Sequence, residues 1–351
     1  MEILVSRDQL PEEESDRNAF LKKYFCELAV TADEVPGGWS LSLGRPTRED
    51  FYIDPELANG LEWWSNNYGK VDVASIPFAV HIRPGLQLSL NDSWTIYSWS
   101  RWLQEPAALG TGHNVITLLH LDDHDDLMPP RVLIAEEAWL DPISRRAVDL
   151  RKPESVESAV KSGAIGIGSF MAPMLHYLSS VNIRHLCSTE YAKERQGPYV
   201  IRPVTIFDDL LAPGSARPAL KLKRIEEASD ANSQGGHPYT VTDDLRSWLT
   251  NLPEGPVIVH IDMDYFNNRF NGDSDWVDYG PKYDPPMQDV LNRIDQVFES
   301  FETEGIAERV ADFAVALSPG FFPADLWAPS IERIEFHVDR LIAAKRWMAR
   351  E

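Results

Sequence analysis

Two uninterrupted apolar runs stand out in the chain, and each ends directly in acidic residues. They cover residues 115–121 (VITLLHL) and 257–261 (VIVHI), and turn residues precede both. Continuous apolar runs of this length are typical of parallel strands that are buried on both faces of a sheet. A third candidate strand covers residues 311–317 (ADFAVAL) and ends in Ser-Pro-Gly-Phe-Phe-Pro.

Helical patterns follow the second and third of these strands. In residues 286–304 and 330–350, apolar positions recur every three or four residues, as on the buried face of a helix. Strands that alternate with helices predict an α/β protein with an open, mostly parallel sheet. Such sheets bind ligands beyond the carboxyl ends of their strands, which is where the acidic residues fall.

The first 70 residues have a different pattern. An amphipathic segment (NAFLKKYFCELAV) precedes a Trp-rich stretch that Gly and Pro interrupt (GGWSLSLGRP, LEWWSNNYG). We therefore predict that residues 1–70 form an N-terminal elaboration packed on a larger domain of residues 71–351. Residues 226–238 (EEASDANSQGGHP) are polar and contain Gly, which predicts an exposed loop.

The chain is strongly acidic, with 33 Lys and Arg against 55 Asp and Glu and a formal net charge of −22. This charge repels phosphate backbones and anionic membranes, so neither nucleic acid nor a membrane is expected as a partner. A cationic substrate fits the charge better. With 351 residues, 43% of them hydrophobic, the chain can bury one large core or two smaller ones.

The cysteines and the apolar windows indicate the compartment. Cys26 and Cys187 have neither metal-binding nor redox spacing, which predicts reduced, structural thiols. The N-terminus carries acidic residues where a secretion signal would be basic and then apolar. The most apolar window, residues 163–181, is interrupted by Pro173 and His176 and does not predict a membrane span. We expect a cytoplasmic protein, and the sequence does not indicate its oligomeric state.

The first acidic motif, HLDDHDD at residues 120–126, directly follows the first strand. Alternate residues of an extended backbone share a face, so Asp122, His124 and Asp126 are expected to project together. Asp123 and Asp125 would then point the other way. Carboxylates this close repel one another strongly when buried, and bound cations would relieve the repulsion.

The second motif, HIDMD, follows the second strand and places Asp262 and Asp264 on one face. If the two strands are neighbours, the motifs form an oxygen-rich site with a single histidine, which favours Mn, Mg or Fe(II) over Zn or Cu. The surplus of carboxylates suits two ions, and such ion pairs activate water for hydrolysis. Each motif alone is also compatible with a solvated loop or a helix cap. His120 and His260 lie one step deeper in the strands and are expected to support the site from behind.

These motifs carry a resemblance to a known family. Asp122-Asp-His-Asp-Asp126 resembles the Asp-x-His-x-Asp signature of the arginase (ureohydrolase) superfamily, and Asp262-Met-Asp264 resembles its later Asp-x-Asp signature. Two further segments, IGIGSFMAPMLH and SPGFFPADLW, are similar to a divergent branch of that family. The branch includes peptide arginases of ribosomal natural-product pathways, which convert arginine residues of a precursor peptide to ornithine and release urea.

The resemblance implies a three-layer α/β/α sandwich with a mostly parallel, doubly wound sheet. It also implies two Mn2+ ions and a bridging hydroxide that attacks the guanidinium carbon. By position, one ion would be bound by Asp122, Asp126 and Asp262. The other would be bound by Asp122, His124, Asp262 and Asp264.

One feature departs from the family pattern. The chain lacks the Gly-Gly-Asp-His-Ser strand end whose histidine completes the ligands of the first ion. Asp92, at the end of LQLSLND, is the nearest equivalent by strand context, although it could equally cap the helix that follows. His81 and His113 are the other candidates, and a site for a single ion, as in the deacetylase relatives, is the alternative.

The expected substrate is an arginine residue within a peptide, because the chain shows none of the motifs by which classical arginases read free arginine. His176 is the candidate donor of a proton to the leaving amine, with helix packing as its alternative role. Asp273 and Asp275 could pair with the guanidinium or belong to a solvated turn. Two other functions stay open: a small-molecule ureohydrolase or amide deacetylase on the same scaffold, and a non-catalytic relative that binds metal.

Overall fold

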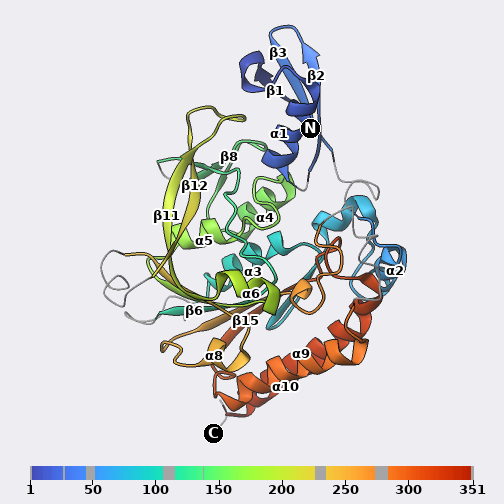
Figure 1. Cartoon of the computed structure of the whole chain (residues 1–351), viewed down its shortest axis with the longest axis vertical. Coiled ribbons are helices and arrows are strands. Elements are labelled where there is room, and N and C mark those ends of the chain that lie inside the picture. The colour runs from blue at the N-terminus through green and yellow to red at the C-terminus, as the bar shows by residue number, and fades with distance from the viewer. Residues whose placement is uncertain are drawn as a thin grey trace.

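A nine-stranded mixed sheet forms the centre of the computed structural model (Figure 1), which describes residues 2–26, 28–44, 52–105, 115–136, 138–225, 235–272 and 284–348. In spatial order its strands are β12 (Ala216–Arg224), β11 (Gly197–Phe207), β13 (His237–Thr242), β10 (Val181–Leu186), β6 (Ile116–Leu121), β14 (Val257–Asp262), β15 (Val310–Ala316), β5 (Leu86–Ser89) and β4 (Val80–Arg83). From β13 to β5 each strand runs parallel to the next, and the antiparallel pairs lie at the two edges. The predicted α/β class with a mostly parallel sheet is therefore confirmed.

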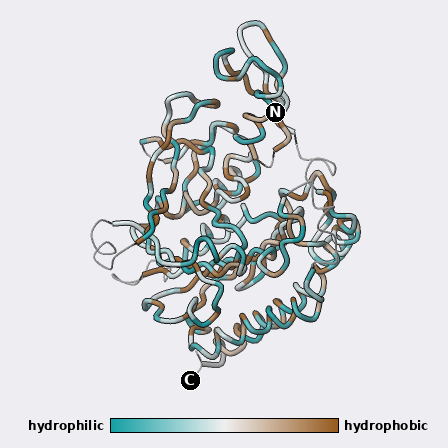
Figure 2. Tube along the Cα trace, viewed as in Figure 1, coloured by the Kyte–Doolittle hydropathy of each residue, from teal (hydrophilic) through white to brown (hydrophobic). Residues whose placement is uncertain are grey.

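Helices flank both faces of this sheet. One hydrophobic core involves α3 (Thr95–Trp102), α4 (Pro153–Ser162) and α5 (Met171–Tyr177). The other involves α2 (Leu57–Asn67), α8 (Leu245–Leu249), α9 (Met287–Thr303) and α10 (Trp327–Met348). The central strands feed both cores, since Leu118 of β6 belongs to the first and Leu119 to the second. Both faces are buried, which explains the uninterrupted apolar runs, seen as brown stretches in Figure 2.

Residues 2–44 form a small lobe at the top of Figure 1. It contains α1 (Glu14–Phe25) and an antiparallel sheet of β1 (Glu2–Ser6), β3 (Gly38–Gly44) and β2 (Ala29–Val35). Its buried Phe25 and Trp39 belong to the same core as α4 and α5, so the lobe is packed against the body. The β11–β12 hairpin rises beside the lobe.

Short elements complete the chain. A third sheet consists of β7 (Leu133–Ile134), β8 (Trp139–Asp141) and β9 (Arg146–Val148), and α6 (Thr189–Arg195) follows β10. Turns of 3-10 helix are η1 (Arg7–Gln9), η2 (Val73–Phe78), η3 (Asp92–Trp94), η4 (Met263–Tyr265) and η7 (Ala324–Leu326). No helix in the described ranges is long and apolar enough to cross a bilayer.

The elements predicted from apolar patterns are confirmed, with small changes at their ends. The three predicted strands are β6, β14 and β15, which are adjacent in the sheet, and the two predicted helices are α9 and α10. Of the predicted loop at 226–238, residues 226–234 lie outside the described residues, while the buried His237 already belongs to β13.

A buried ion pair holds the β11–β12 hairpin against its neighbours. Nη1 of Arg217 lies 3.3 Å from Oδ2 of Asp208, and both side chains are almost fully buried. Arg217 also donates to the carbonyls of Pro129 and Pro130, and Asp208 accepts a hydrogen bond from the Tyr24 hydroxyl at 2.5 Å. The pair therefore ties the hairpin to both the lobe and the segment that follows the first acidic motif.

We expect Arg217→Met to lower the free energy of unfolding by about 3–5 kcal/mol, because a buried Asp208 would lose its cation. Urea denaturation measures this change. The matched control is Arg7→Met, which removes an exposed ion pair with Glu34 and should cost less than about 1 kcal/mol. Equal losses in the two variants would contradict a stabilising role for the buried pair.

Candidate metal centre

The acidic ends of two neighbouring strands meet at one edge of the sheet. β6 and β14 pair in parallel register, with His120 opposite His260. β6 ends at Leu121. β14 ends at Asp262, which is also the N-cap of η4. Both acidic motifs therefore leave the sheet at the same level and on the same side.

The first motif is a tight turn and not the extended segment that we expected. The backbone N–H of His124 donates to Oδ1 of Asp122 at 2.6 Å, and Asp126 adopts a positive φ of 50°. A carboxylate that accepts from the amide two residues later is a common way for aspartate to reverse the chain. The expected alternation of side chains along an extended backbone is therefore wrong for this segment, although Asp122, His124 and Asp126 do face a common region.

The two motifs are joined by direct hydrogen bonds through Asp264. Its Oδ1 accepts from the backbone N–H of Asp123 at 3.0 Å, and its Oδ2 lies 2.8 Å from Nδ1 of His124. Nε2 of His124 lies 3.2 Å from Oδ1 of Asn271, an acceptor that fixes this nitrogen as N–H. Ligand atoms of Asp122, His124 and Asp264 all lie within 4.8 Å of one another and could hold a metal ion.

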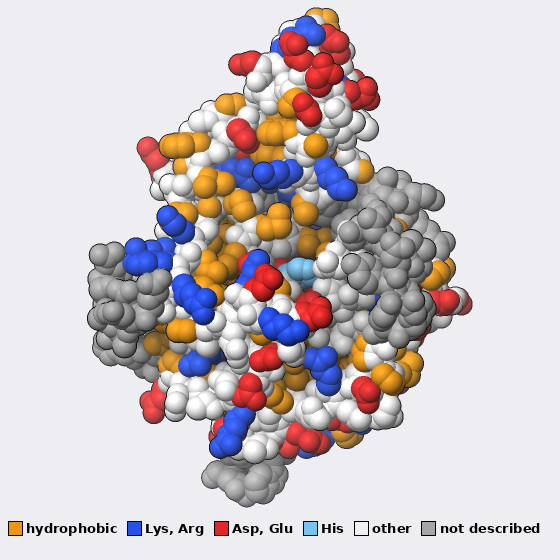
Figure 3. All heavy atoms as spheres, in the orientation of Figure 1, with side chains coloured by type: hydrophobic (Ala, Val, Ile, Leu, Met, Phe, Trp, Pro, Cys, Tyr) orange, Lys and Arg blue, Asp and Glu red, His pale blue; other side chains and the backbone are white. Residues whose placement is uncertain are grey.

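A cavity of about 210 Å³ opens over these side chains. Its acidic lining consists of Asp92, Asp125, Asp126, Asp262 and Asp264, beside His124. Its apolar lining consists of Met128, Ile167, Pro319 and Phe321. Figure 3 shows the molecule in the orientation of Figure 1, with a histidine side chain beside acidic side chains near the middle of the view. Hydrophobic side chains lie between this histidine and the N-terminal lobe.

The structure also brings Asp92 and Asp262 to the cavity. Asp92 begins η3 just after β5, and its Oδ2 accepts from the backbone N–H of Gly168 at 2.8 Å. Asp262 accepts a hydrogen bond from the Ser318 hydroxyl at 2.6 Å through Oδ2. Ser318 lies in the SPGFFPADLW segment, whose conformation thereby orients one of the predicted ligands.

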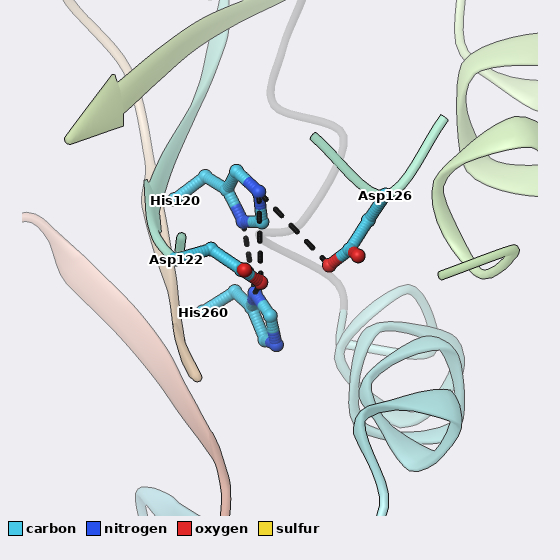
Figure 4. Close-up of side chains that lie close together, drawn as sticks. All are labelled: His120, Asp122, Asp126 and His260. Carbon is cyan, nitrogen blue, oxygen red and sulfur yellow. Dashed lines mark hydrogen bonds and ion pairs between the residues drawn. The ribbon is translucent and has the colours of Figure 1, made fainter. Parts of the chain in front are cut away.

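A second group of possible metal ligands overlaps the first (Figure 4) and consists of His120, Asp122, Asp126 and His260. Nε2 of His120 lies 3.8 Å from Oδ2 of Asp122 and 4.0 Å from Oδ2 of Asp126. Nδ1 of His260 lies 3.9 Å from Oδ2 of Asp122. Asp122 belongs to both groups, so it is the side chain best placed to be shared by two ions.

Hydrogen bonds assign the tautomers of the two histidines. Nε2 of His120 lies 3.1 Å from the carbonyl of His124, so it must donate to that oxygen. Burial holds the pKa of both His120 and His260 well below the usual range, to about 3 for His260, so both rings are neutral. Nδ1 of His120 then accepts from Nδ1–H of His260, 2.9 Å away. His120 thus holds the turn of the first motif through a backbone carbonyl, as expected for support from behind.

His185 is a third buried histidine, beside His120 and His260, and was not among the residues predicted from the sequence. It pairs with His120 in the register of β10 and β6. Its Nε2 donates to the carbonyl of Asp122 at 3.0 Å, and its Nδ1 accepts from the Tyr239 hydroxyl at 2.6 Å. Burial lowers the pKa of His185 to about 4. A signal was present, since His-Leu-Asp, His-Leu-Cys and His-Ile-Asp end three strands of the chain.

Charge at this site is strongly unbalanced. Burial, and then the neighbouring carboxylates, raise the pKa of Asp122, Asp126 and Asp262 well above the usual range. Burial opposes protonation of His124, but the carboxylates of Asp264, Asp126 and Asp262 together outweigh it and raise the pKa of His124 to about 10. One imidazolium cannot neutralise this many carboxylates.

The residues present fit a divalent metal. Oδ2 of Asp122 and Oδ2 of Asp126 are buried, and no hydrogen-bond donor from the described residues reaches either atom. The described lining of the cavity contains neither lysine nor arginine to pair with them. Buried carboxylates of this kind need a proton or a cation to neutralise them, and the carboxylate and imidazole ligands gathered here could hold metal ions.

Strained backbone gathers around the same cavity. Among the described residues, Cys26, Asp126 and Ser318 line it with positive φ values of 53°, 50° and 46°. Asn271, which bonds to His124, has a φ of 49°. Left-handed conformations of residues other than glycine are uncommon, and their clustering is typical of functional sites.

Other residues named from the sequence lie elsewhere. Nε2 of His176 donates to the carbonyl of Ala219 at 2.9 Å, and its ring contacts Trp139 in a separate hollow. His81 lies on the edge strand β4, and its ring packs against that of Tyr68. The structure therefore brings neither histidine to the acidic cavity, and the role of His176 as proton donor stays a prediction.

The remaining candidates, four aspartates and one histidine, divide into two kinds. Asp123 accepts hydrogen bonds from the backbone N–H of Ser188 and the side chain of Asn268. Asp125 was expected to point away from the site but lines the cavity, and it forms an ion pair with Arg195. His113, Asp273 and Asp275 lie outside the described residues.

Comparison with known proteins adds no family to this description. No protein-family model matches the chain, and no curated protein matches it either. The geometry alone therefore supports a buried His/Asp cluster that could hold metal ions, at the carboxyl edge of a mostly parallel α/β sheet.

Proposed function

We propose that this protein is a Mn(II)-dependent hydrolase that converts arginine residues of a peptide to ornithine and releases urea. One observation carries the proposal: a small cavity has an acidic floor, apolar walls and, in its described lining, no cationic Lys or Arg. An arginine side chain has the complementary chemistry, because an aliphatic stem carries a planar cation with several hydrogen-bond donors.

The ligands would divide into two overlapping sets. One ion would be held by Asp122, Asp126 and Asp262, with Asp92 in place of the histidine that the family uses. The second would be held by Asp122, His124, Asp262 and Asp264. When bound, two such ions supply a water of lowered pKa and polarise the substrate.

Several residues of the chain would orient these ligands. Asn271 fixes the ring of His124 so that Nδ1 faces Asp264. The Ser318 hydroxyl fixes Asp262, and His185 and His120 hold the backbone of the first motif at Asp122 and His124. Partners of this kind hold metal ligands in place, and their loss typically costs about 10- to 100-fold in metal affinity or activity.

The cavity favours an arginine residue in a chain over free arginine. Free arginine carries an α-carboxylate, and the described lining residues include no lysine or arginine to bind it. A volume of about 210 Å³ is below the range of roughly 300–1,000 Å³ typical of sites that enclose a whole small molecule. A single side chain would fill it while the peptide backbone stays outside. The net charge of −22 favours a basic peptide.

The test is to incubate the Mn(II)-loaded protein with a peptide that contains one arginine. We expect a mass loss of about 42 Da, the CN2H2 unit that hydrolysis of a guanidinium removes, together with an equivalent of urea. The same peptide with lysine in place of arginine is the control and should keep its mass. Urea release from free arginine should be at least about tenfold slower.

Other results would contradict the proposal in distinct ways. Faster urea release from free arginine than from the peptide would indicate a small-molecule ureohydrolase. Hydrolysis of acetylated amines without any urea would indicate a deacetylase. Stoichiometric metal binding with no hydrolysis of any of these substrates would indicate a non-catalytic metal-binding protein.

A further inference from the structure

The N-terminal lobe reaches the acidic cavity through the end of its helix. Cys26 follows α1 directly, is half-buried, and lines the cavity opposite residues of the main body. Its φ of 53° and ψ of −94° are unusual for a residue with a side chain, so the surrounding structure must hold it there.

Buried hydrogen bonds fix this part of the lobe to the body. Nε of Arg131 donates to the carbonyl of Tyr24 at 3.0 Å, and its Nη1 donates to the carbonyl of Gly163 at 2.6 Å. Leu28 packs so closely on Gly163 that an added Cβ would lie 2.6 Å from its Cδ1. The Tyr24 hydroxyl donates to Asp208. The end of α1 is therefore a rigid part of the cavity wall.

A second observation, independent of Cys26, points to a ligand in this cavity. Asp126 lines it with only 6% of its surface exposed, and among the described residues no hydrogen-bond donor reaches its Oδ2. Met128 and Phe321 line the same cavity and supply apolar surface that a ligand could contact. A small thiol at the end of α1 leaves room for a slender aliphatic stem, and a larger side chain there would narrow the same passage.

We infer that Cys26 is a specificity-determining residue, which makes the N-terminal lobe one wall of the passage for an unbranched cationic side chain. The inference rests on the proposed function for the identity of that side chain, an arginine residue of a peptide. It goes further in assigning substrate selection to a lobe that carries none of the candidate metal ligands.

Thiol labelling tests this inference without relying on turnover. The chain has two cysteines, and Cys187 is a silent internal reference because it is buried and burial raises its pKa to about 12. We expect N-ethylmaleimide to modify Cys26 alone in the Mn(II)-loaded protein. An arginine-containing peptide should slow the modification at least about fivefold, whereas the same peptide with norleucine in place of arginine should not. Equal labelling rates with and without saturating arginine peptide would overturn the inference.

A bulk substitution gives the second test. Cys26→Phe should raise KM for the arginine peptide by roughly tenfold or more and keep the metal content of the unmodified protein. Ala19→Phe is the matched control, because it places the same phenylalanine side chain at an exposed position of α1 and should leave KM unchanged. An unchanged KM in Cys26→Phe, with urea still released, would also overturn the inference.

The two tests separate this inference from the proposed function. Protection of Cys26 by the arginine peptide without any urea release would support the place of Cys26 in the wall of the passage and refute the proposed hydrolysis of arginine. Urea release with neither protection nor a change in KM would uphold the reaction and refute the role of the lobe.

Discussion

Replacing Asp122 by asparagine should abolish both Mn(II) binding and hydrolysis. Asp122 belongs to both groups of candidate ligands, and its buried Oδ2 has no hydrogen-bond donor within the described part of the chain. The amide keeps the shape of the side chain but removes the charge that a shared ligand must supply. We expect metal affinity to fall by more than the roughly 100-fold that marks the loss of a supporting residue. Equilibrium dialysis with elemental analysis and the urea assay measure the two effects.

The matched control lies one residue away. Asp123→Asn makes the same chemical change in the same motif, but this side chain accepts hydrogen bonds from Ser188 and Asn268 and does not line the cavity. It should keep the metal content of the unmodified protein. Full metal content in Asp122→Asn, or equal losses in both variants, would refute the assignment of Asp122.

The metal-free protein should lose stability as the pH rises, and Mn(II) should reverse that trend. The folded-state pKa of Asp122, Asp126 and Asp262 is raised by burial and by neighbouring carboxylates, so the folded state holds protons that the unfolded state releases above about pH 4. A group that binds protons more tightly when folded loses its stabilising effect as the pH rises. His124 acts in the same direction, since its stabilisation is complete below about pH 6.5 and is lost toward its folded pKa of about 10.

Binding of Mn(II) stabilises the folded protein more strongly as the pH rises, because the ligands must be deprotonated to bind the ion. At a thousandfold excess over the dissociation constant the ion should add about 4 kcal/mol. Thermal melts at pH 5 and pH 8, with Mn(II) and with a chelator, measure both trends. The gain from Mn(II) should be larger at pH 8 than at pH 5, and the slope of the chelated protein should be shallower in Asp122→Asn. A gain from Mn(II) that is the same at both pH values would contradict the account.

Local patterns in the sequence were sufficient to predict the parts of the fold that consist mainly of apolar residues. β6 and β14 are buried on both faces, so their apolar runs are visible without any alignment of partners. Their acidic ends then follow from the parallel arrangement. The edge strand β12 and its neighbour β11 are only partly buried, and their mixed composition gives no comparable signal.

Contacts between distant segments account for what the sequence left open. The Ser318 hydroxyl reaches Asp262, and the Asn271 side chain reaches His124, from loops whose path depends on the whole fold. Cys26 reaches the cavity only because a separate lobe docks above it. The turn at Asp122 shows why alternating side chains could not be extrapolated beyond the strand. The Asp122 side chain accepts a hydrogen bond from the backbone N–H of His124, and a side-chain acceptor of this kind can take the place of a backbone partner in the sheet and end the strand.

The most direct test of the account is anomalous X-ray scattering from crystals of the protein grown with Mn(II). The account predicts manganese peaks in direct contact with the Asp122 carboxylate, one also touching Asp126 and the other touching His124 and Asp264. The absence of any manganese peak in the acidic cavity at saturating Mn(II), or peaks confined to other parts of the molecule, would contradict the account.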